Sequence, residues 1–299
     1  MLTLALIKAR ARLAGGILEN GEYGPRFIPR GLWSNAHARF ICDNSIKELH
    51  FNAQLGYADA GGYEFLVDLD VPLVGVKFVD HNAVDLTSIH SHQLTIKSID
   101  VSFSGKLIKA VEFETFPLLE RLAILVKIPG MSSIFKCQGL RHLALSSYAG
   151  ELAEREFSGV PQLKELFLSS VKLQGIEPLM TLTALESLSI SSARGFSSLA
   201  GIGQLRQLRE LKIESCKKLL CFPEIASLYN LRTLWLFDCG EIESISSLTN
   251  LPNLRRLDII GNTVIRDGNL SGLKSLENLK TVCVVNHHHY HPQAREINS

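Results

Sequence analysis

A six-residue frame, apolar-x-x-apolar-x-apolar, recurs eleven times along this chain and constrains its fold more than any other feature. All 33 apolar places, three in each of eleven frames, hold Leu, Ile, Val or Phe. Self-similarity at a period of about 20 to 50 residues is typical of a solenoid, whose repeats bury their apolar sides only by stacking. The frames begin at Ile46, Leu73, Ile96, Leu119, Leu140, Leu163, Leu185, Leu208, Leu231, Leu254 and Leu279.

Two different periods alternate within each repeat. The fourth and sixth places of a frame, as in LRELKIES (208–215) and LRTLWLFD (231–238), have the spacing of a strand with one buried face. The segment before each strand has apolar residues at every third place, such as Ile176, Leu179 and Leu182, which favours a 3-10 or extended turn. The corresponding places before the third frame hold Thr87, His90 and Gln93, so we expect the first three turns to be irregular.

These frames resemble leucine-rich repeats of the 22-residue class, which bacterial internalins share with a regulatory subunit of protein phosphatase 1. The resemblance covers roughly residues 46–286. It implies an α/β solenoid: a leucine-rich-repeat horseshoe of about eleven turns, with a curved parallel β-sheet on the concave face and irregular or 3-10 convex segments. We expect residues 1–45 to form an N-terminal cap, 46–286 the repeat domain, and 287–299 a solvated polar C-terminal tail.

The ninth place of the repeat, where this family favours Asn or Cys, holds Cys216, Cys239 and Asn262 in three successive turns. A disulfide between the two thiols and two separate buried thiols are both open, and the second is favoured. None of the six cysteines forms a C-x-x-C pair, which argues against zinc and thioredoxin-type sites. Cys283 is predicted to point outward and to be the most reactive thiol.

The sequence contains no motif that indicates catalysis. It lacks a phosphate-binding G-x-x-x-x-G-K-[ST], a G-x-G-x-x-G after a strand, an H-E-x-x-H and a G-x-S-x-G. His90 and His92 have no third metal ligand nearby in the sequence, and the histidines at 287, 288, 289 and 291 fall in the expected tail. We therefore predict a protein that is not an enzyme, with no catalytic residues, no metal and no cofactor.

Charge and hydropathy limit the partners and the location. Lys and Arg total 31 against 30 Asp and Glu, so we expect neither nucleic acid nor a membrane surface as partner. The chain has no run of 18 apolar residues. The first residues, MLTLALIKARARLAGG, place apolar residues before charge, the reverse of a secretory signal, and an organelle transit peptide is the alternative. We expect a cytoplasmic protein, or one secreted through a specialised system without a classical signal.

Side chains at the third, fifth and seventh places of each frame are predicted to point away from the core. Serines at 146, 147, 169, 170, 191 and 192 form a small-residue floor, and Trp235, Phe237 and Ile260 lie beside it, ringed by charge. Exposed aromatics within charge are typical of a protein-binding hot spot, although Trp235 and Phe237 could instead pack under a loop or the tail. The predicted partner-binding residues are Phe167, Glu210, Lys212, Thr233, Trp235, Phe237, Arg256, Asp258 and Ile260.

The predicted function is that of a non-catalytic scaffold, monomeric when free, that docks another protein on its concave face. Resemblance alone suggests a bacterial immunity protein that neutralises a toxin. The alternatives are an effector delivered into host cells or an immune-receptor-like recognition module, and a phosphatase regulatory subunit. The run from Cys216 through Pro223 to Cys239 resembles plant receptor repeats, but no nucleotide-binding motif accompanies it.

Overall fold

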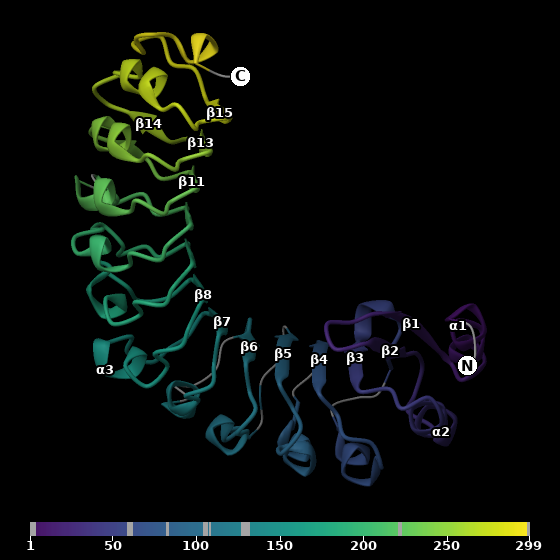
Figure 1. Cartoon of the computed structure of the whole chain (residues 1–299). Helices are drawn as coiled ribbons and strands as arrows, with labels where there is room; N and C mark the ends of the chain where they lie inside the picture. The colour runs from purple at the N-terminus through teal and green to yellow at the C-terminus, as the bar shows by residue number, and fades with distance from the viewer. Residues whose placement is uncertain are drawn as a thin grey trace. The chain divides into compact units, whose positions relative to one another are not determined.

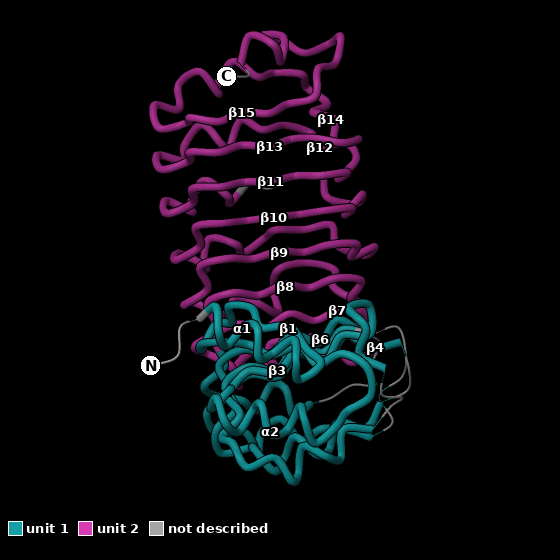
Figure 2. The backbone as a smooth tube through the Cα atoms, turned by 90° about the vertical axis from the view of Figure 1, so that its right-hand side faces the viewer, with its two compact units in different colours: residues 1–140 teal, residues 141–299 magenta. Residues whose placement is uncertain are grey.

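The computed structural model describes residues 4–58, 62–81, 84–103, 107, 109–126, 132–220 and 223–297. The chain divides into two compact units, unit 1 (Met1–Leu140) and unit 2 (Arg141–Ser299), shown in different colours in Figure 2. Every helix in the described part of the chain is too short or too polar to cross a lipid bilayer.

Unit 1 begins with helix α1 and an antiparallel hairpin, and parallel strands follow in sequence order. The sheet order is β1-β2-β3-β4-β5-β6, and only the first pair is antiparallel. Its helices and strands are α1 (Leu4–Leu13), β1 (Gly16–Asn20), β2 (Pro25–Pro29), α2 (Asn35–Asp43), β3 (Glu48–Asn52), β4 (Gly75–Asp80), β5 (Ser98–Phe103) and β6 (Arg121–Ile124). Its 3-10 helices are η1 (Ala53–Leu55), η2 (Glu64–Asp68), η3 (Thr87–His92), η4 (Phe113–Thr115) and η5 (Ser132–Lys136).

Unit 2 repeats one strand and one short helical segment per turn, with the strands along one side and the helical segments along the other (Figure 1). Its main strands are parallel in the order β7-β8-β9-β10-β11-β13-β15, and β12 pairs with β14 separately. The strands are β7 (His142–Ser146), β8 (Glu165–Ser169), β9 (Ser187–Ser191), β10 (Glu210–Glu214), β11 (Thr233–Phe237), β12 (Glu241–Ile242), β13 (Arg256–Ile260), β14 (Val264–Ile265) and β15 (Thr281–Val284). The helical segments are α3 (Glu154–Phe157), η6 (Glu177–Leu179), η7 (Ile202–Gln204), η8 (Pro223–Ser227), η9 (Ser246–Asn250), η10 (Ser271–Ser275) and η11 (Ala294–Glu296).

All eleven sequence frames form strands, and each strand begins two residues after its frame begins. Of the 33 apolar places, 32 are buried, and only Leu279, in the last frame, is partly exposed. In parallel, in-register strands these side chains stack turn upon turn, for example Leu188 beside Leu211 and Leu211 beside Leu234. The predicted solenoid of parallel strands and 3-10 segments is therefore confirmed.

The convex segments follow the predicted three-residue period, with one shift in register. Ile176, Leu179 and Leu182 are fully buried, as predicted. Before β5 the buried residues are instead Leu86, Ile89 and His92, one place earlier than Thr87, His90 and Gln93. One extra residue between the convex segment and the strand moves the pattern, so this turn has a regular buried face after all.

The C-terminal segment contradicts the expected solvated tail. Tyr290 is 2% exposed, and its hydroxyl oxygen accepts a hydrogen bond from the Ile265 N–H at 2.8 Å. The His291 N–H donates to the Gly268 carbonyl at 2.8 Å, and Ala294 is fully buried. Residues 287–297 therefore pack against the final turn, because Tyr290 and Ala294 supply apolar surface to bury. The polar composition of the segment as a whole had suggested a solvated tail.

The ninth-place residue of the turn after β13 is also corrected. Gly261 takes a left-handed φ of 67° and Asn262 is exposed, whereas Thr263 is 1% exposed. The Thr263 hydroxyl oxygen accepts a hydrogen bond from the Cys239 N–H at 3.0 Å. Thr263 therefore occupies the slot predicted for Asn262, since this repeat is longer than its neighbours and shifts the inward residue by one place.

Candidate functional site

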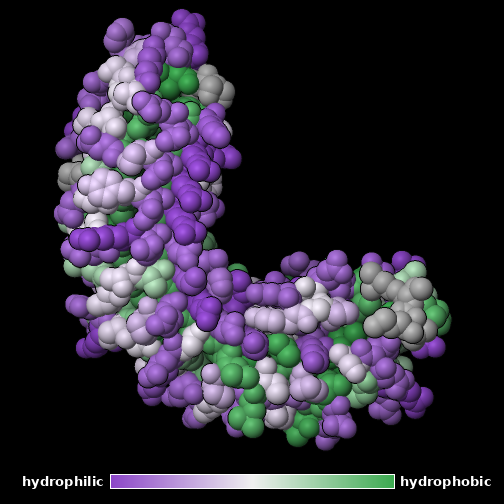
Figure 3. Space-filling model, viewed as in Figure 1, coloured by the Kyte–Doolittle hydropathy of each residue, from purple (hydrophilic) through white to green (hydrophobic). Residues whose placement is uncertain are grey.

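The strand face of unit 2 consists of the third, fifth and seventh places of its frames, which point away from the core. In β9, β10 and β11 burial alternates strictly, with partly exposed residues at these places and buried residues between them. Strand register aligns the same place of successive turns, such as Lys212 beside Trp235 and Trp235 beside Asp258. The strand side of unit 2 is largely hydrophilic in Figure 3.

Trp235 and Phe237 occupy the fifth and seventh places of β11 and stack on each other. Their ring centroids lie 5.8 Å apart and their planes differ by 15°. Both side chains are partly exposed rather than fully exposed. Ile260 is partly exposed and pairs in register with Phe237. The three apolar residues thus lie on two neighbouring strands, each partly exposed.

An ion pair lies on each side of the aromatic stack, on the two strands that flank β11. On β10, Lys212 Nζ lies 3.0 Å from Glu210 Oε1, and Ser187 Oγ donates to Glu210 Oε2 at 3.2 Å. On β13, Arg256 Nε lies 2.5 Å from Asp258 Oδ2, and the hydrogen bonds that Arg256 donates to Asp258 raise the pKa of Arg256. Both pairs join third and fifth places of one strand, so neither crosses over the tryptophan.

Asp258 departs from the expectation that it would offer an outward charge beside Trp235. It is 4% exposed, because the exposed Arg256 side chain lies over it. A partner would therefore meet the Arg256 guanidinium rather than the carboxylate. Asp258 fixes the position of that guanidinium through a short charge-assisted hydrogen bond.

Eight of the nine predicted site residues lie together on three neighbouring strands, β10, β11 and β13. Phe167 does not join them, because it lies on β8, three strands from Trp235, or about 14 Å at 4.8 Å per strand. It is flanked in register by Ala144 and Ser189. We call the joined set the aromatic cluster: Glu210, Lys212, Thr233, Trp235, Phe237, Arg256, Asp258 and Ile260.

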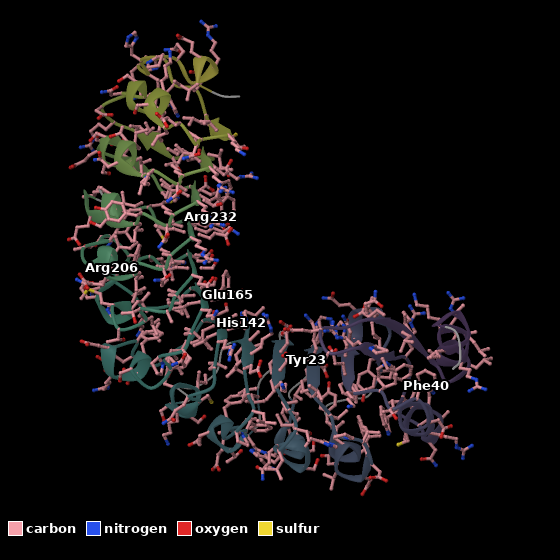
Figure 4. The ribbon with its side chains drawn as sticks, viewed as in Figure 1. Tyr23, Phe40, His142, Glu165, Arg206 and Arg232 are labelled. Atoms are coloured by element: carbon pink, nitrogen blue, oxygen red, sulfur yellow. The ribbon has the colours of Figure 1, made fainter. Side chains whose placement is uncertain are left out.

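The sequence-based prediction did not include a contact between His142 and Glu165 at the other end of the same face. His142 Nδ1 on β7 lies 2.8 Å from Glu165 Oε2 on β8, and both side chains are labelled in Figure 4. Both occupy third places, which the register pairs directly. The alignment of third places already puts His142 beside Glu165 in the sequence.

The strand face of unit 1 differs, because the turn of the β1–β2 hairpin lies over it. The Glu48 carboxylate, at the third place of β3, accepts hydrogen bonds from the Glu22 N–H at 3.1 Å and from the Tyr23 N–H. It also accepts two from Arg26, at 2.8 and 3.2 Å. At the far end of the turn, Glu22 Oε2 lies 3.1 Å from Arg121 Nε on β6.

Small residues make room for this turn. Gly75 and Ser98 hold the third places of β4 and β5, between Glu48 and Arg121. A Cβ at Gly21 would overlap the Glu48 carboxylate, and a Cβ at Gly75 would lie 3.2 Å from Glu48 Cγ. The glycines were visible in the sequence, but the contact between Glu22 and Glu48 joins residues 26 apart, and no periodic pattern predicts it.

The rest of that face carries polar pairs. Lys77 Nζ lies 2.7 Å from Asp100 Oδ2 on the next strand. His50 is 8% exposed, and its Nε2 lies 3.1 Å from Asn52 Nδ2. Burial lowers the pKa of His50, and the positive charge of Lys77 lowers it further. The face therefore presents fixed, internally paired groups rather than an apolar patch.

The cysteines of unit 2 fill backbone slots as favoured from the sequence. Cys216 and Cys239 are both buried and both free, and Cys239 Sγ donates to the Ile213 carbonyl at 3.3 Å. Burial raises the pKa of Cys239 to about 12 and also raises the pKa of Cys216. Cys283, at the fifth place of β15, is exposed, and Cys221 lies outside the described residues.

The paired histidines before β5 are bound to backbone groups. His92 Nε2 hydrogen bonds with the Leu66 carbonyl at 2.8 Å, and His90 Nδ1 with the Thr87 carbonyl at 2.9 Å. Across the described ranges, no three His, Cys, Asp or Glu side chains gather closely enough to hold a metal ion. These two histidines therefore serve the packing of the convex side.

Comparisons with known proteins agree with this architecture. Residues 229–275 match a family model described as Leucine Rich repeats (2 copies). The structure is similar to an internalin (inlF) from Listeria monocytogenes, with 18% identity, a TM-score of 0.66, and coverage of 83% of this chain and 70% of that one. It is also similar to a TDR receptor, with 22% identity, a TM-score of 0.61, and coverage of 85% and 45%.

A third similar structure is a leucine-rich-repeat protein of Leptospira interrogans. It shares 15% identity at a TM-score of 0.51, with coverage of 87% of this chain and 77% of that one. Comparison of the sequence with curated proteins finds no significant match. At these identities the similar structures establish the fold alone.

Proposed function

We propose that this leucine-rich-repeat protein is a non-catalytic scaffold that docks a partner protein on the strand face of unit 2. The observation that carries the proposal is the stacked Trp235–Phe237 pair, partly exposed between two ion pairs. Partly exposed aromatics can bury large additional area on binding at low entropic cost, since their ring orientation is already fixed. Charged groups around such an anchor set the orientation of the partner more than its affinity.

The chemistry of the face favours protein over other ligands. Each carboxylate of the aromatic cluster is paired with a Lys or Arg of its own strand, so the cations are not free to track phosphates. Tyrosine, tryptophan and arginine are the residue types most enriched in protein-binding hot spots, and Trp235 and Arg256 stand on adjacent strands. An open, repeated strand face also suits a protein surface better than a small molecule, which prefers an enclosed pocket.

Three biological roles remain hypotheses for this scaffold: an immunity protein that neutralises a toxin, an effector or immune-receptor-like module, and a phosphatase subunit. All three need a docked protein, so they share the proposed face. The identity of the protein captured from the source organism distinguishes them. A toxin, a host protein or a phosphatase catalytic subunit would each select one role.

The test compares Trp235→Ala/Phe237→Ala with the unaltered protein. The partner is captured from a lysate of the source organism, identified by mass spectrometry, purified and titrated. We expect the double variant to bind at least tenfold more weakly with an unchanged circular dichroism spectrum. The matched control is Leu220→Ala/Tyr229→Ala, since these apolar side chains are exposed outside the strand face. Equal affinities for the double variant and the unaltered protein would remove the aromatic cluster as the docking site.

Fluorescence gives a second readout. The chain has two tryptophans, and Trp33 of unit 1 stacks on Phe65 at a centroid distance of 3.9 Å. A Trp33→Phe variant therefore reports on Trp235 alone. Partner binding should shift its emission to shorter wavelength as water leaves the indole ring, and an unchanged spectrum at saturation would contradict docking there.

A further inference from the structure

A groove runs along the loops that follow β8, β9 and β10, at the carboxyl ends of these strands in unit 2. Four basic side chains line it, namely Lys172, Arg194, Lys217 and Lys218. The groove shares no residue with the aromatic cluster, which lies on the strands themselves. It is therefore a separate surface, and the proposed function does not use it.

The repeat itself creates this row of cations. The eighth residue of each turn, Ser170, Ser192 and Ser215, takes a left-handed φ of 53° and reverses the chain direction. The ninth residue then turns inward and is buried, as Val171, Ala193 and Cys216 show. The tenth residue must point outward, and it is Lys172, Arg194 or Lys217 in three successive turns, each exposed.

The row is unusual in its charge. No acidic residue lines the groove, and within the described ranges none of the four cations forms an ion pair, unlike Lys212 or Arg256 on the strand face. Acidic residues bound the row at both ends. Glu151 follows β7 on one side, and Asp238 and Glu241 follow β11 on the other.

The length of the row limits its ligand. Lys172 and Lys217 hold equivalent places two strands apart, about 10 Å at 4.8 Å per strand. An extended peptide covers that distance with about three residues. The Gly240 loop closes the β11 end, where a Cβ at Gly240 would lie 3.0 Å from the Lys217 carbonyl oxygen.

We propose that this groove binds a short acidic segment of a protein, with three or four carboxylates in an extended stretch. The unpaired cations supply the attraction, and the serine hydroxyls at the strand ends add hydrogen-bond donors. The groove has no aromatic side chain on which bases could stack, and the acidic residues at its ends repel a longer phosphate backbone. Both observations favour a peptide over a nucleic acid.

The experiment measures binding of a fluorescein-labelled hexaglutamate peptide by fluorescence anisotropy at low ionic strength. The test variant is Lys172→Gln/Arg194→Gln/Lys217→Gln. The matched control is Arg206→Gln/Arg232→Gln/Lys274→Gln, which removes three charges from exposed side chains of unit 2 outside the groove (Arg206 and Arg232 are labelled in Figure 4). Circular dichroism checks that both variants fold.

We expect at least tenfold weaker binding by the test variant, less than twofold change in the control, and no binding of a hexaglutamine peptide. Trp235→Ala/Phe237→Ala should bind hexaglutamate with unchanged affinity. The proposal for the groove and the proposal for the aromatic cluster are therefore tested independently. Equal loss in the control variant, loss in the Trp235/Phe237 variant, or no binding by the unaltered protein would overturn the proposal. Tighter binding of a hexathymidylate oligonucleotide would overturn it in favour of nucleic acid.

Discussion

The strand faces of the two units are built from the same repeat, yet the face of unit 1 is covered by a hairpin turn and the face of unit 2 is open. In unit 1 a carboxylate at a third place, Glu48, is buried and binds the turn of the unit's own hairpin. In unit 2 the third-place carboxylate of β10, Glu210, is partly exposed and pairs only with neighbouring side chains. The repeat fixes where side chains point, and the identity of a few of them decides whether the face is covered or open.

This difference explains why binding is proposed for unit 2. A face whose polar groups are satisfied by a covalently attached hairpin gains little from a new partner, because a partner would first have to displace it. An open face with a partly exposed aromatic pair has surface still to bury. Three predictions test the contrast, beginning with the largest effect.

Thiol reactivity tests whether the strand face of unit 2 is open along its length. Cys42 in unit 1 and Cys283 at the fifth place of β15 are exposed, whereas Cys137, Cys216 and Cys239 are buried. Burial raises the pKa of Cys137 and of Cys239 to about 12, so at pH 8 only about one in ten thousand of these thiols is ionised. We expect iodoacetamide to label Cys42 and Cys283 at least a hundredfold faster, measured by peptide mass spectrometry.

The assay uses a Cys221→Ser background, so that labelling is followed only at the five cysteines named above. Labelling should become uniform in urea, which confirms that burial and not local sequence causes the difference. Slow labelling of Cys283 in the folded protein would mean that the face is covered at β15. The contrast between the units would then fail at that end.

The second prediction compares equivalent carboxylates in the two units. Glu48→Ala removes the acceptor of four hydrogen bonds and leaves Arg26 with only its 3.4 Å pair to Glu19, so we expect a loss of about 3 to 5 kcal/mol in stability. Glu210→Ala removes a partly exposed pair with Lys212 and should cost about 0 to 1 kcal/mol. The two residues share the third place of the frame, which makes each the control for the other.

Urea unfolding can be followed separately in each unit, because Trp33 lies in unit 1 and Trp235 in unit 2. A Trp235→Phe background reports on unit 1 and a Trp33→Phe background on unit 2. If Glu48→Ala and Glu210→Ala lower the midpoint equally, burial of the third-place carboxylate does not distinguish the faces.

The sequence was sufficient for the eleven strands of the repeats, although not for β1, β2, β12 and β14, and physical chemistry explains why. A buried strand face needs apolar residues at fixed intervals, so eleven frames could place eleven strands without knowledge of any long-range contact. The fold and the partly exposed position of Trp235 and Phe237 followed from that alternation. Whether these two residues bind a partner is a question that periodicity does not answer.

The errors arose where spacing changed or where distant residues met. One extra residue before β5 moved the buried set to Leu86, Ile89 and His92, and a longer repeat after β13 put Thr263 where Asn262 was expected. Asp258 was assigned to the surface because its place in the frame points outward, but a periodic pattern does not show that Arg256 covers it. The hairpin turn over unit 1 and the packed C-terminal segment depend on contacts between residues some 25 apart in sequence or more.

The third prediction has the smallest expected effect. It asks whether the outer ion pair helps to hold the hairpin turn on the strand face of unit 1. Glu22 and Arg121 form an ion pair at 3.1 Å between side chains that are 43% and 36% exposed. Lys164 and Glu186 form a similar exposed pair in unit 2, at 2.9 Å, with no hairpin attached. A double-mutant cycle with Gln replacements should give about 0.2 to 1 kcal/mol for each pair, decreasing with added salt.

Equal coupling energies would mean that buried Glu48 alone anchors the turn, and that the outer ion pair only follows it. In that case Arg121→Gln should leave hydrogen exchange of the Glu22 and Tyr23 amides nearly unchanged, since both N–H groups still donate to Glu48. We expect this result, because a buried charge-assisted network outweighs a solvent-screened pair. Much faster exchange of both amides in Arg121→Gln would show that the cover on unit 1 opens from its outer end, and that its strand face is less permanently closed than the buried carboxylate implies.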